Sequence, residues 1–176
     1  MALLLFLAGC DEEARRGAGV QLQERPAYTG IPCPKIEGWK IHMCTSFVPV
    51  RMTRDFNGQS AEITVITKAL ERNEWDKNVA RWGREIGIDA DASMSKQKTT
   101  KIFVDDIACS RIHLENNTSE NGEAIVGVLL PERTRNWFIR LKGTISAVNN
   151  TENDFQTFLD EFQSPDKNQK IYGAKQ

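Results

Sequence analysis

The stretch WFIRLKGTISAVNNTENDFQTFLDEF, Trp137–Phe162, predicts a strand, a turn and a closing amphipathic helix. In the strand, apolar side chains at alternate positions share one face, while Phe138 and two basic side chains share the other. We expect Gly143 to end the strand, and Thr151, with Asp154 three residues later, to cap the helix. The apolar stripe of the helix recurs at i, i+3, i+4 and i+7 and consists of Phe155, Phe158, Leu159 and Phe162. Since no other segment supplies as much aromatic surface, the sheet must receive this helix.

Length and composition set the class of protein. At 176 residues the chain is long enough for one domain with a real core and hardly for two. Charged residues are 27% and hydrophobic residues 40% of the chain, as in an ordinary globular domain. The formal net charge of −1 gives no electrostatic reason to expect nucleic acid as a partner.

The chain begins with MALLLFLAGC, in which an apolar run precedes Cys10. Leu7-Ala8-Gly9-Cys10 resembles the lipobox of bacterial lipoproteins, in which the cysteine becomes the first mature residue. The resemblance implies a diacylglyceryl thioether and an amide-linked acyl chain such as palmitate on Cys10, an effectively permanent membrane anchor. No Lys or Arg precedes the run, which suggests that Met1 lies inside a longer signal peptide. The alternative is a chance apolar start with a buried cysteine; the run is too short to span a bilayer.

The rest of the chain divides by composition into a tether, a domain and a tail. Residues 11–34 lack an apolar period and predict a flexible tether between lipid and domain. Residues 35–164 carry all the periodic segments and predict a single α+β domain. Residues 165–176 predict a loose polar tail. Residues 1–10 are then the lipoprotein signal peptide and lipobox.

Alternating apolar and polar residues predict seven strands. Two of them flank Asn57-Gly58, the strongest short-range signal for a hairpin, and two more flank a tight turn at Asp105-Asp106. The expected strands are Gly38–Met43, Val50–Phe56, Ala61–Lys68, Ile102–Val104, Ile107–Leu114, Ala124–Leu130 and Trp137–Lys142.

The first helix is expected at Asn73–Ile88, with Asn73 as its cap. Its apolar stripe consists of Trp75, Val79, Trp82 and Ile86. The order of three strands, a helix, four strands and a helix predicts an α+β sandwich. Its antiparallel β-sheet has about six to seven strands, with two main helices laid on one face. No parallel βαβ repeat is present in the pattern, so Rossmann-like nucleotide binding is not expected.

Residues 78–88, NVARWGREIGI, resemble the motif Asn-x-x-Arg-Trp-Arg-x-Gln-Leu-Gly-Leu of small, uncharacterised bacterial envelope proteins. These proteins also carry an early Gly-Trp, as at Gly38-Trp39, and a closing Trp-Phe-(Phe/Tyr)-Lys-Leu-x-Gly, to which residues 137–143 are similar. The departures from the motifs are Gly83 for Arg, Glu85 for Gln and Arg140 for Lys. The resemblance implies a PsbP/Mog-type sandwich. This fold is shared by extrinsic photosystem subunits and the envelope protein DcrB, which are binding or accessory modules.

Four residues of the helical motif are candidate binding residues: Asn78, Arg81, Trp82 and Glu85. Trp and Arg dominate binding hot spots, but Trp82 lies on the apolar stripe and is expected in the core. Arg81 and Glu85 are spaced for an ion pair along the helix. Asn78 and Arg81 flank the stripe, which favours them for buried polar anchoring or for ligand contact.

Neither a metal nor a cofactor is expected. His42 and His113 lie in separate predicted strands, and although Cys44 follows two residues after His42, no further ligand pattern accompanies them. Surface histidines are the simpler interpretation. No serine lies in a nucleophile elbow, and Asp105-Asp106 predicts a turn before an acid/base pair.

Once Cys10 is lipidated, Cys33, Cys44 and Cys109 remain. In an oxidising envelope, Cys33–Cys44 and Cys44–Cys109 are both open as disulfides, and either leaves one odd thiol. We therefore expect a lipid-anchored envelope protein, facing the periplasm or the exterior. It would be a non-enzymatic binding or accessory module for a membrane complex. The alternatives are a thiol-redox or other enzyme using Cys44 or Cys109, and a small-ligand-binding lipoprotein.

Overall fold

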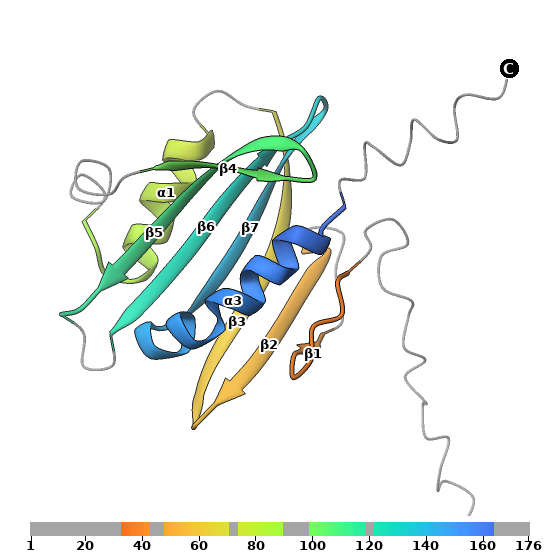
Figure 1. The fold of residues 1–176 in the computed structure, drawn as a ribbon. Coiled ribbons are helices and arrows are strands. Elements are labelled where there is room, and N and C mark those ends of the chain that lie inside the picture. The colour runs from red at the N-terminus through yellow and green to blue at the C-terminus, as the bar shows by residue number, and fades with distance from the viewer. Residues whose placement is uncertain (1–32, 43–47, 71–73, 90–98, 119–121, 164–176) are drawn as a thin grey trace, which may run out of the picture.

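The computed structural model describes residues 33–42, 48–70, 74–89, 99–118 and 122–163 (Figure 1). The predictions on Cys10, Cys44 and the helix cap Asn73 lie outside these residues. So do those on the tail 165–176 and on the tether up to residue 32.

Seven strands form one antiparallel sheet in the order β1-β2-β3-β7-β6-β5-β4, so β1 and β4 are its edges and β7 lies at its centre. The strands are β1 (Lys40–Ile41), β2 (Val50–Phe56), β3 (Gln59–Ala69), β4 (Thr100–Val104), β5 (Ile107–Asn116), β6 (Glu123–Pro131) and β7 (Arg135–Thr144). The helices of the described residues are α1 (Glu74–Glu85) and α3 (Ile145–Glu161). The predicted α+β fold, with an antiparallel sheet and two main helices, is confirmed.

Both predicted tight turns are confirmed and set the register of their hairpins. Asn57 and Gly58 have φ of 50° and 79°, and Asp105 and Asp106 have φ of 51° and 61°. Positive φ at both central residues is the type I′ geometry, whose twist matches that of the flanking strands. In the second hairpin, this turn aligns Val104 with Ile107 and each earlier residue of β4 with a later one of β5.

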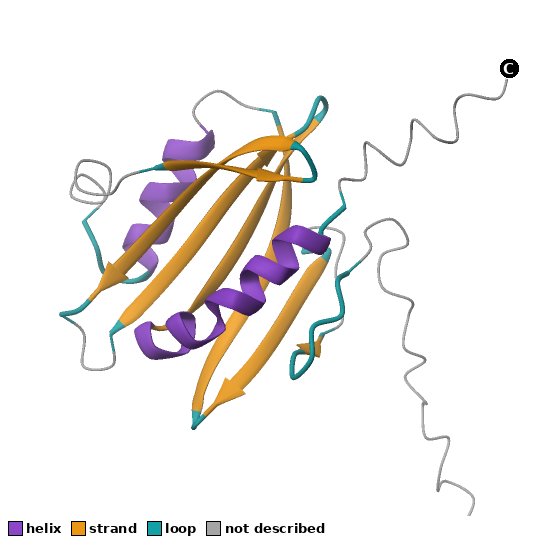
Figure 2. Ribbon diagram, viewed as in Figure 1, coloured by secondary structure: helices purple, strands orange, loops and turns teal. Residues whose placement is uncertain are grey.

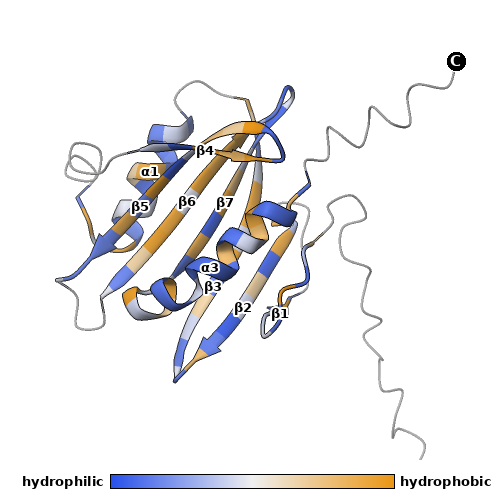
Figure 3. Cartoon of the chain, in the orientation of Figure 1, coloured by the Kyte–Doolittle hydropathy of each residue, from blue (hydrophilic) through white to orange (hydrophobic). Residues whose placement is uncertain are grey.

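The two helices pack on opposite faces of the sheet (Figure 2). Ile139 of β7 belongs to the core under α3, while its neighbour Phe138 belongs to the core under α1. Successive strand residues point to opposite faces, so the central strands need apolar residues at every position. β6 meets this need, because Ala124 to Val128 are all buried and much of the strand has hydrophobic colours (Figure 3). The expectation that both helices share one face was therefore wrong.

Helix α3 begins earlier than predicted. Its cap is Thr144, whose hydroxyl accepts a hydrogen bond from the N–H of Ala147 at 3.2 Å. Thr151 is buried inside the helix and donates to the carbonyl of Ala147 at 2.7 Å, a common bond for threonine within helices. Consequently the predicted cap at Thr151 was wrong. Gly143 does not end the strand either, because β7 continues to Thr144 and Gly143 pairs with Ala61 of β3.

Asp154, predicted as part of the cap, instead connects α3 to the N-terminal part of the domain. Its carboxylate accepts a hydrogen bond from Trp39 Nε1 at 2.9 Å and another from Arg54 of β2. Trp39 is buried, with 8% of its surface exposed. The early Trp and the closing helix thus meet directly, although they are far apart in the sequence.

Helix α1 has the predicted apolar stripe, with Val79, Trp82 and Ile86 buried against the sheet. It ends in a Schellman motif around Gly87, which has φ of 76°. The N–H of Ile88 donates to the Gly83 carbonyl at 2.8 Å, and that of Gly87 to the Arg84 carbonyl at 3.1 Å. Within the described part of the chain, no helix combines the length and the apolar character needed to cross a membrane.

Candidate functional site on the α1 face

Helix α1 has two flanks of different chemistry. One flank carries a polar row at positions 74, 78, 81 and 85, which is linked to β3 and β7 by ion pairs. The other faces the β4–β5 edge and contributes residues to a pocket. Three of the four predicted binding residues lie on the first flank, and the fourth, Trp82, lies beneath the helix.

Asn78 and Arg81 are brought into direct contact. Asn78 is 1% exposed, and its Nδ2 donates to the carbonyl of Glu74 at 2.7 Å and to Glu74 Oε2 at 3.2 Å. Arg81 Nη2 donates to Asn78 Oδ1 at 2.7 Å. Lys68 at the end of β3 contacts the same Glu74 carboxylate at 3.4 Å. Asn78 is thus a buried polar anchor between the first turn of α1 and Arg81, which is itself exposed.

Glu85 is joined to β7 and not to Arg81. Its two carboxylate oxygens accept hydrogen bonds from Arg140 Nη1 at 2.6 Å and Lys142 Nζ at 3.0 Å. Burial raises the pKa of Glu85, but the charges and hydrogen bonds of Arg140 and Lys142 outweigh it and hold the pKa below its ordinary value. Arg140 also approaches Glu62 of β3 at 3.8 Å. These ion pairs fasten the last turn of α1 to the centre of the sheet.

Trp82 lies in the core, as its place on the stripe predicted. It is 1% exposed and packs edge-on against Trp75 and Phe138. Its Nε1–H is buried and has no hydrogen-bond partner among the described residues. The ring therefore stabilises α1 on the sheet by packing and is not available to a ligand at the surface.

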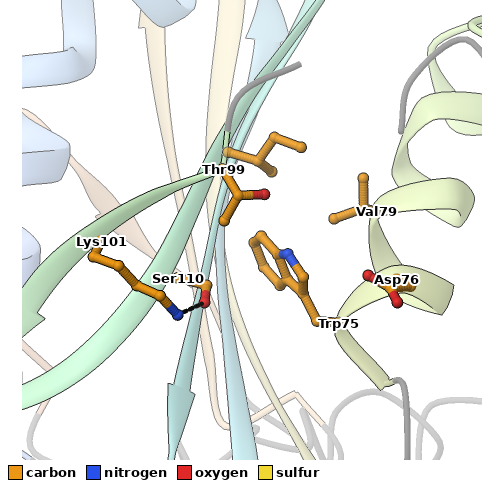
Figure 4. Close-up of a pocket in the computed structure, with 7 residues that line it drawn as sticks. Trp75, Asp76, Val79, Thr99, Lys101 and Ser110 are labelled. Carbon is orange, nitrogen blue, oxygen red and sulfur yellow. Dashed lines mark hydrogen bonds between the residues drawn. The ribbon is translucent and has the colours of Figure 1, made fainter. Parts of the chain in front are cut away.

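A pocket of about 240 Å³ lies between α1 and the β4–β5 edge. It is lined by Trp75, Asp76, Val79, Thr99, Lys101, Ser110 and Ile112. Trp75 projects from α1 toward the strands and lies between Lys101 and Ser110 on one side and Asp76 on the other (Figure 4). Lys101 Nζ donates to Ser110 Oγ at 2.9 Å across the two paired strands. The pocket thus has an apolar part from the helix and a wall of donors from the hairpin.

Sequence reasoning missed this pocket, although part of it was within reach. The turn at Asp105-Asp106 fixes the hairpin register, and that register places Lys101 opposite Ser110. The other wall required knowing that α1 covers this end of the sheet. That information is not in the local pattern, because α1 packs on strands that follow it in the chain.

Each of the two histidines lies beside a polar side chain of the sheet. His42 Nε2 lies 2.7 Å from Thr53 Oγ1, and His113 Nε2 lies 3.2 Å from Glu115 Oε1. Four strands separate β1, next to His42, from β5, which carries His113. Among the described residues, no group of three or more His, Cys, Asp or Glu side chains is placed to hold a metal ion.

Cys109 is fully buried, and its Sγ–H donates to the Ile107 carbonyl at 3.3 Å. Burial raises the pKa of the Cys109 thiol to about 11. A thiolate is the nucleophilic form of cysteine, so this thiol is unreactive at neutral pH. The pairing of Cys44 lies outside the described residues.

The fold defines an α+β protein in which one antiparallel sheet carries a helix on each face. Three solved structures are similar to it, each at 12% sequence identity. LpqN of Mycobacterium tuberculosis, described as involved in cell envelope biogenesis, aligns over 74% of this chain and 80% of its own, with a TM-score of 0.47. A Pseudomonas aeruginosa protein of unknown function aligns over 76% and 87%, and the cyanobacterial PsbP of Synechocystis over 73% and 83%, both with a TM-score of 0.45.

No family model and no curated protein matches the sequence. Membership of the uncharacterised envelope family named above therefore stays a prediction.

Proposed function

We propose that this protein is a lipid-anchored envelope protein whose α+β domain is a non-enzymatic binding or accessory module for a membrane complex. The observation that carries the proposal is the Leu7-Ala8-Gly9-Cys10 motif directly behind an apolar run. In bacterial lipoproteins this motif directs the mature chain to a membrane surface outside the cytoplasm. The domain would then work at that surface.

The chemistry of the domain supports binding over catalysis. The carboxylate of Glu85 is held by Arg140 and Lys142, and Asn78 is held by Glu74 and Arg81. Polar groups in such bonds position α1. The buried Cys109 thiol lacks the lowered pKa of a nucleophile, which argues against a redox or hydrolytic role for that residue.

A second function, binding of a small ligand, is favoured by one specific observation. The pocket beside Trp75 combines apolar surface with converging polar groups, the usual composition of ligand sites. An accessory module and a ligand-binding module are compatible, since a ligand can regulate how a module binds its partner.

The experiment that tests the anchored-module proposal is membrane fractionation of the source bacterium, with a C-terminal tag on the chromosomal copy so that any signal residues before Met1 are kept, followed by mild-detergent pull-down. We expect the wild type in the membrane fraction together with a defined complex. Cys10→Ala should release the domain into the soluble fraction and lose the complex. A Cys33→Ala variant, which also removes one thiol, is the matched control and should behave as the wild type. A soluble wild type, or a Cys10→Ala variant that stays in the membrane, would contradict the anchor.

A further inference from the structure

We propose that the pocket between α1 and the β4–β5 edge is a site for a carboxylate carried by a small apolar group. The inference rests on the binding function proposed above and names the class of ligand. It concerns six of the residues that line the pocket: Trp75, Asp76, Val79, Thr99, Lys101 and Ser110.

The strand side of the pocket is a donor wall. Lys101 Nζ uses one of its three N–H groups on Ser110 Oγ, at 2.9 Å, and keeps two. Because Ser110 Oγ accepts that bond, its own hydroxyl hydrogen is left to donate elsewhere. Thr99 adds a second hydroxyl to the lining. An ammonium and two hydroxyls therefore line the strand side of the pocket, which suits an anionic acceptor such as a carboxylate.

Apart from Asp76, the helix side of the pocket is apolar. Val79 is 1% exposed and Ile112 beneath it is 3% exposed, so both are fixed parts of the core. The Trp75 ring is held edge-on against Trp82, with ring centroids 6.0 Å apart. The half-buried Trp75 ring, backed by these buried side chains, presents a preformed surface to a flat or branched hydrocarbon, and burial of that hydrocarbon is favourable in proportion to the area removed from water.

The volume limits the size of the ligand. A pocket of 240 Å³ holds about eight water molecules at roughly 30 Å³ each. It is smaller than the roughly 300–1,000 Å³ of sites for drug-sized molecules. The matching ligand has about eight to ten non-hydrogen atoms, the size of hexanoate or phenylacetate.

Asp76 determines how the ligand is oriented in the pocket. Among the described residues it is the one acidic side chain that lines the pocket, and it lies across Trp75 from Lys101 (Figure 4). Like charges repel, so the carboxylate of the ligand is directed to the strand side and its hydrocarbon to the helix side. Removing the Asp76 charge should strengthen binding of an acid, and removing the Lys101 charge should weaken it.

The carboxylate has two possible sources, a free organic acid or the C-terminal carboxylate of a partner chain. Both sources present a carboxylate next to an apolar group. The experiment therefore uses probes of both kinds, so that the two sources can be told apart. The probes are phenylacetate, its neutral isostere phenylacetamide, and the peptide Ala-Ala-Ala-Ala-Leu with a free or an amidated C-terminus.

The test is an NMR titration of the full, nitrogen-15-labelled chain in mild detergent, following the indole N–H of Trp75, which is assigned by Trp75→Phe. We expect a free carboxylate to bind with a Kd on the order of 1 mM or tighter and its amide to bind at least tenfold more weakly. Lys101→Met should weaken binding about tenfold, Lys101→Arg should retain it, and Asp76→Asn should strengthen it about threefold. Lys40→Met, a lysine on the opposite edge strand, is the matched control and should change nothing.

The probe that binds more tightly identifies the source of the carboxylate. Tighter binding of phenylacetate indicates a free acid, and tighter binding of the peptide with a free C-terminus indicates a partner chain. Equal shifts with acid and amide would overturn the proposal. So would equal affinity in Lys101→Met and Lys40→Met, or no shift with any probe. None of these results affects the Cys10→Ala fractionation, so failure of this site and failure of the anchored-module proposal can be told apart.

Discussion

Trp82 lies so close to Gly127 that a Cβ built at position 127 would be 2.2 Å from Cζ3 of the indole ring. Real Cβ atoms essentially never show such a contact, so α1 packs on β6 at this point against bare backbone. The contact sets the depth at which α1 lies on the sheet. It thereby sets the place of Trp75, which is on the same helix and forms a wall of the pocket.

The first prediction concerns this contact. Gly127→Ala should lower the free energy of unfolding by about 1–3 kcal/mol, because the added methyl forces the ring or the helix to move. Urea denaturation measures the change. In a Trp82→Leu background the same substitution should cost clearly less, since the clashing ring is gone and the two sites are coupled. An equal cost in both backgrounds would show that the contact does not limit the packing.

The second prediction concerns Glu85 and pH. Its pKa in the folded chain lies below the ordinary value of 4.5, so its ion pairs stabilise the fold fully above pH 4.5. That contribution is lost as the pH falls through the lower folded pKa. Glu85→Gln should therefore cost about 0.5–1 kcal/mol at neutral pH, a modest value because the pair is partly exposed to solvent.

The same difference should shrink at acidic pH, as the pH falls below 4.5 and through the lower folded pKa. Urea denaturation of the wild type and Glu85→Gln at both pH values measures it. Glu161 is an exposed carboxylate at the end of α3, and Glu161→Gln is the control. It should leave the free energy of unfolding nearly unchanged at both pH values. A cost for Glu85→Gln that grows as the pH falls would have the wrong sign for this account.

The third prediction concerns Cys109. With its pKa raised to about 11 and its side chain fully buried, Cys109 should resist alkylation in the folded chain at about pH 8. In a variant with the other three cysteines replaced by alanine, iodoacetamide labelling followed by mass spectrometry should show reaction only in denaturant. Labelling of the folded chain within minutes would revive Cys109 as a candidate nucleophile.

The fourth prediction concerns Asp154, which accepts hydrogen bonds from Trp39 and Arg54. Asp154→Ala leaves both donors without this acceptor, at an expected cost of about 1–3 kcal/mol. Hydrogen exchange should become faster in residues 33–42 and remain unchanged in α1. Asp160→Ala, an exposed position on the same helix, is the control. Unchanged exchange in residues 33–42 would mean that packing alone holds that segment.

The sequence was a good guide wherever local chemistry decides the structure. The type I′ turns at Asn57-Gly58 and Asp105-Asp106 follow from residue type, and the apolar stripe of α1 follows from periodicity. The predictions from sequence were wrong where tertiary contacts decide the structure. Thr151 has the residue type of a cap, but Thr144, the last residue of β7, takes that role. The apolar run of β6 indicates that both faces of the sheet are covered, because a strand with one solvated face would alternate.

The candidate site was predictable only in part. Trp82 was correctly expected in the core. Asn78 and Arg81 were both favoured for buried polar anchoring or for ligand contact; Asn78 is such an anchor, whereas Arg81 is exposed. Arg140 and Lys142 as partners of Glu85 were not foreseen, since the helix and β7 are distant in sequence. To predict the pocket one must know that α1 lies over the β4–β5 edge, and the order of the elements alone does not give that position.

The fifth prediction is the most direct test of the central claim that this is a lipid-anchored module. The measurement is the intact mass and N-terminal peptide of the chain purified from bacterial membranes. The account predicts a chain that begins at Cys10 and carries a diacylglyceryl group and an acyl chain. The Cys10→Ala variant should show neither the cleavage nor the added mass. A chain that still contains residues 1–9, with an unmodified thiol at Cys10, would contradict it.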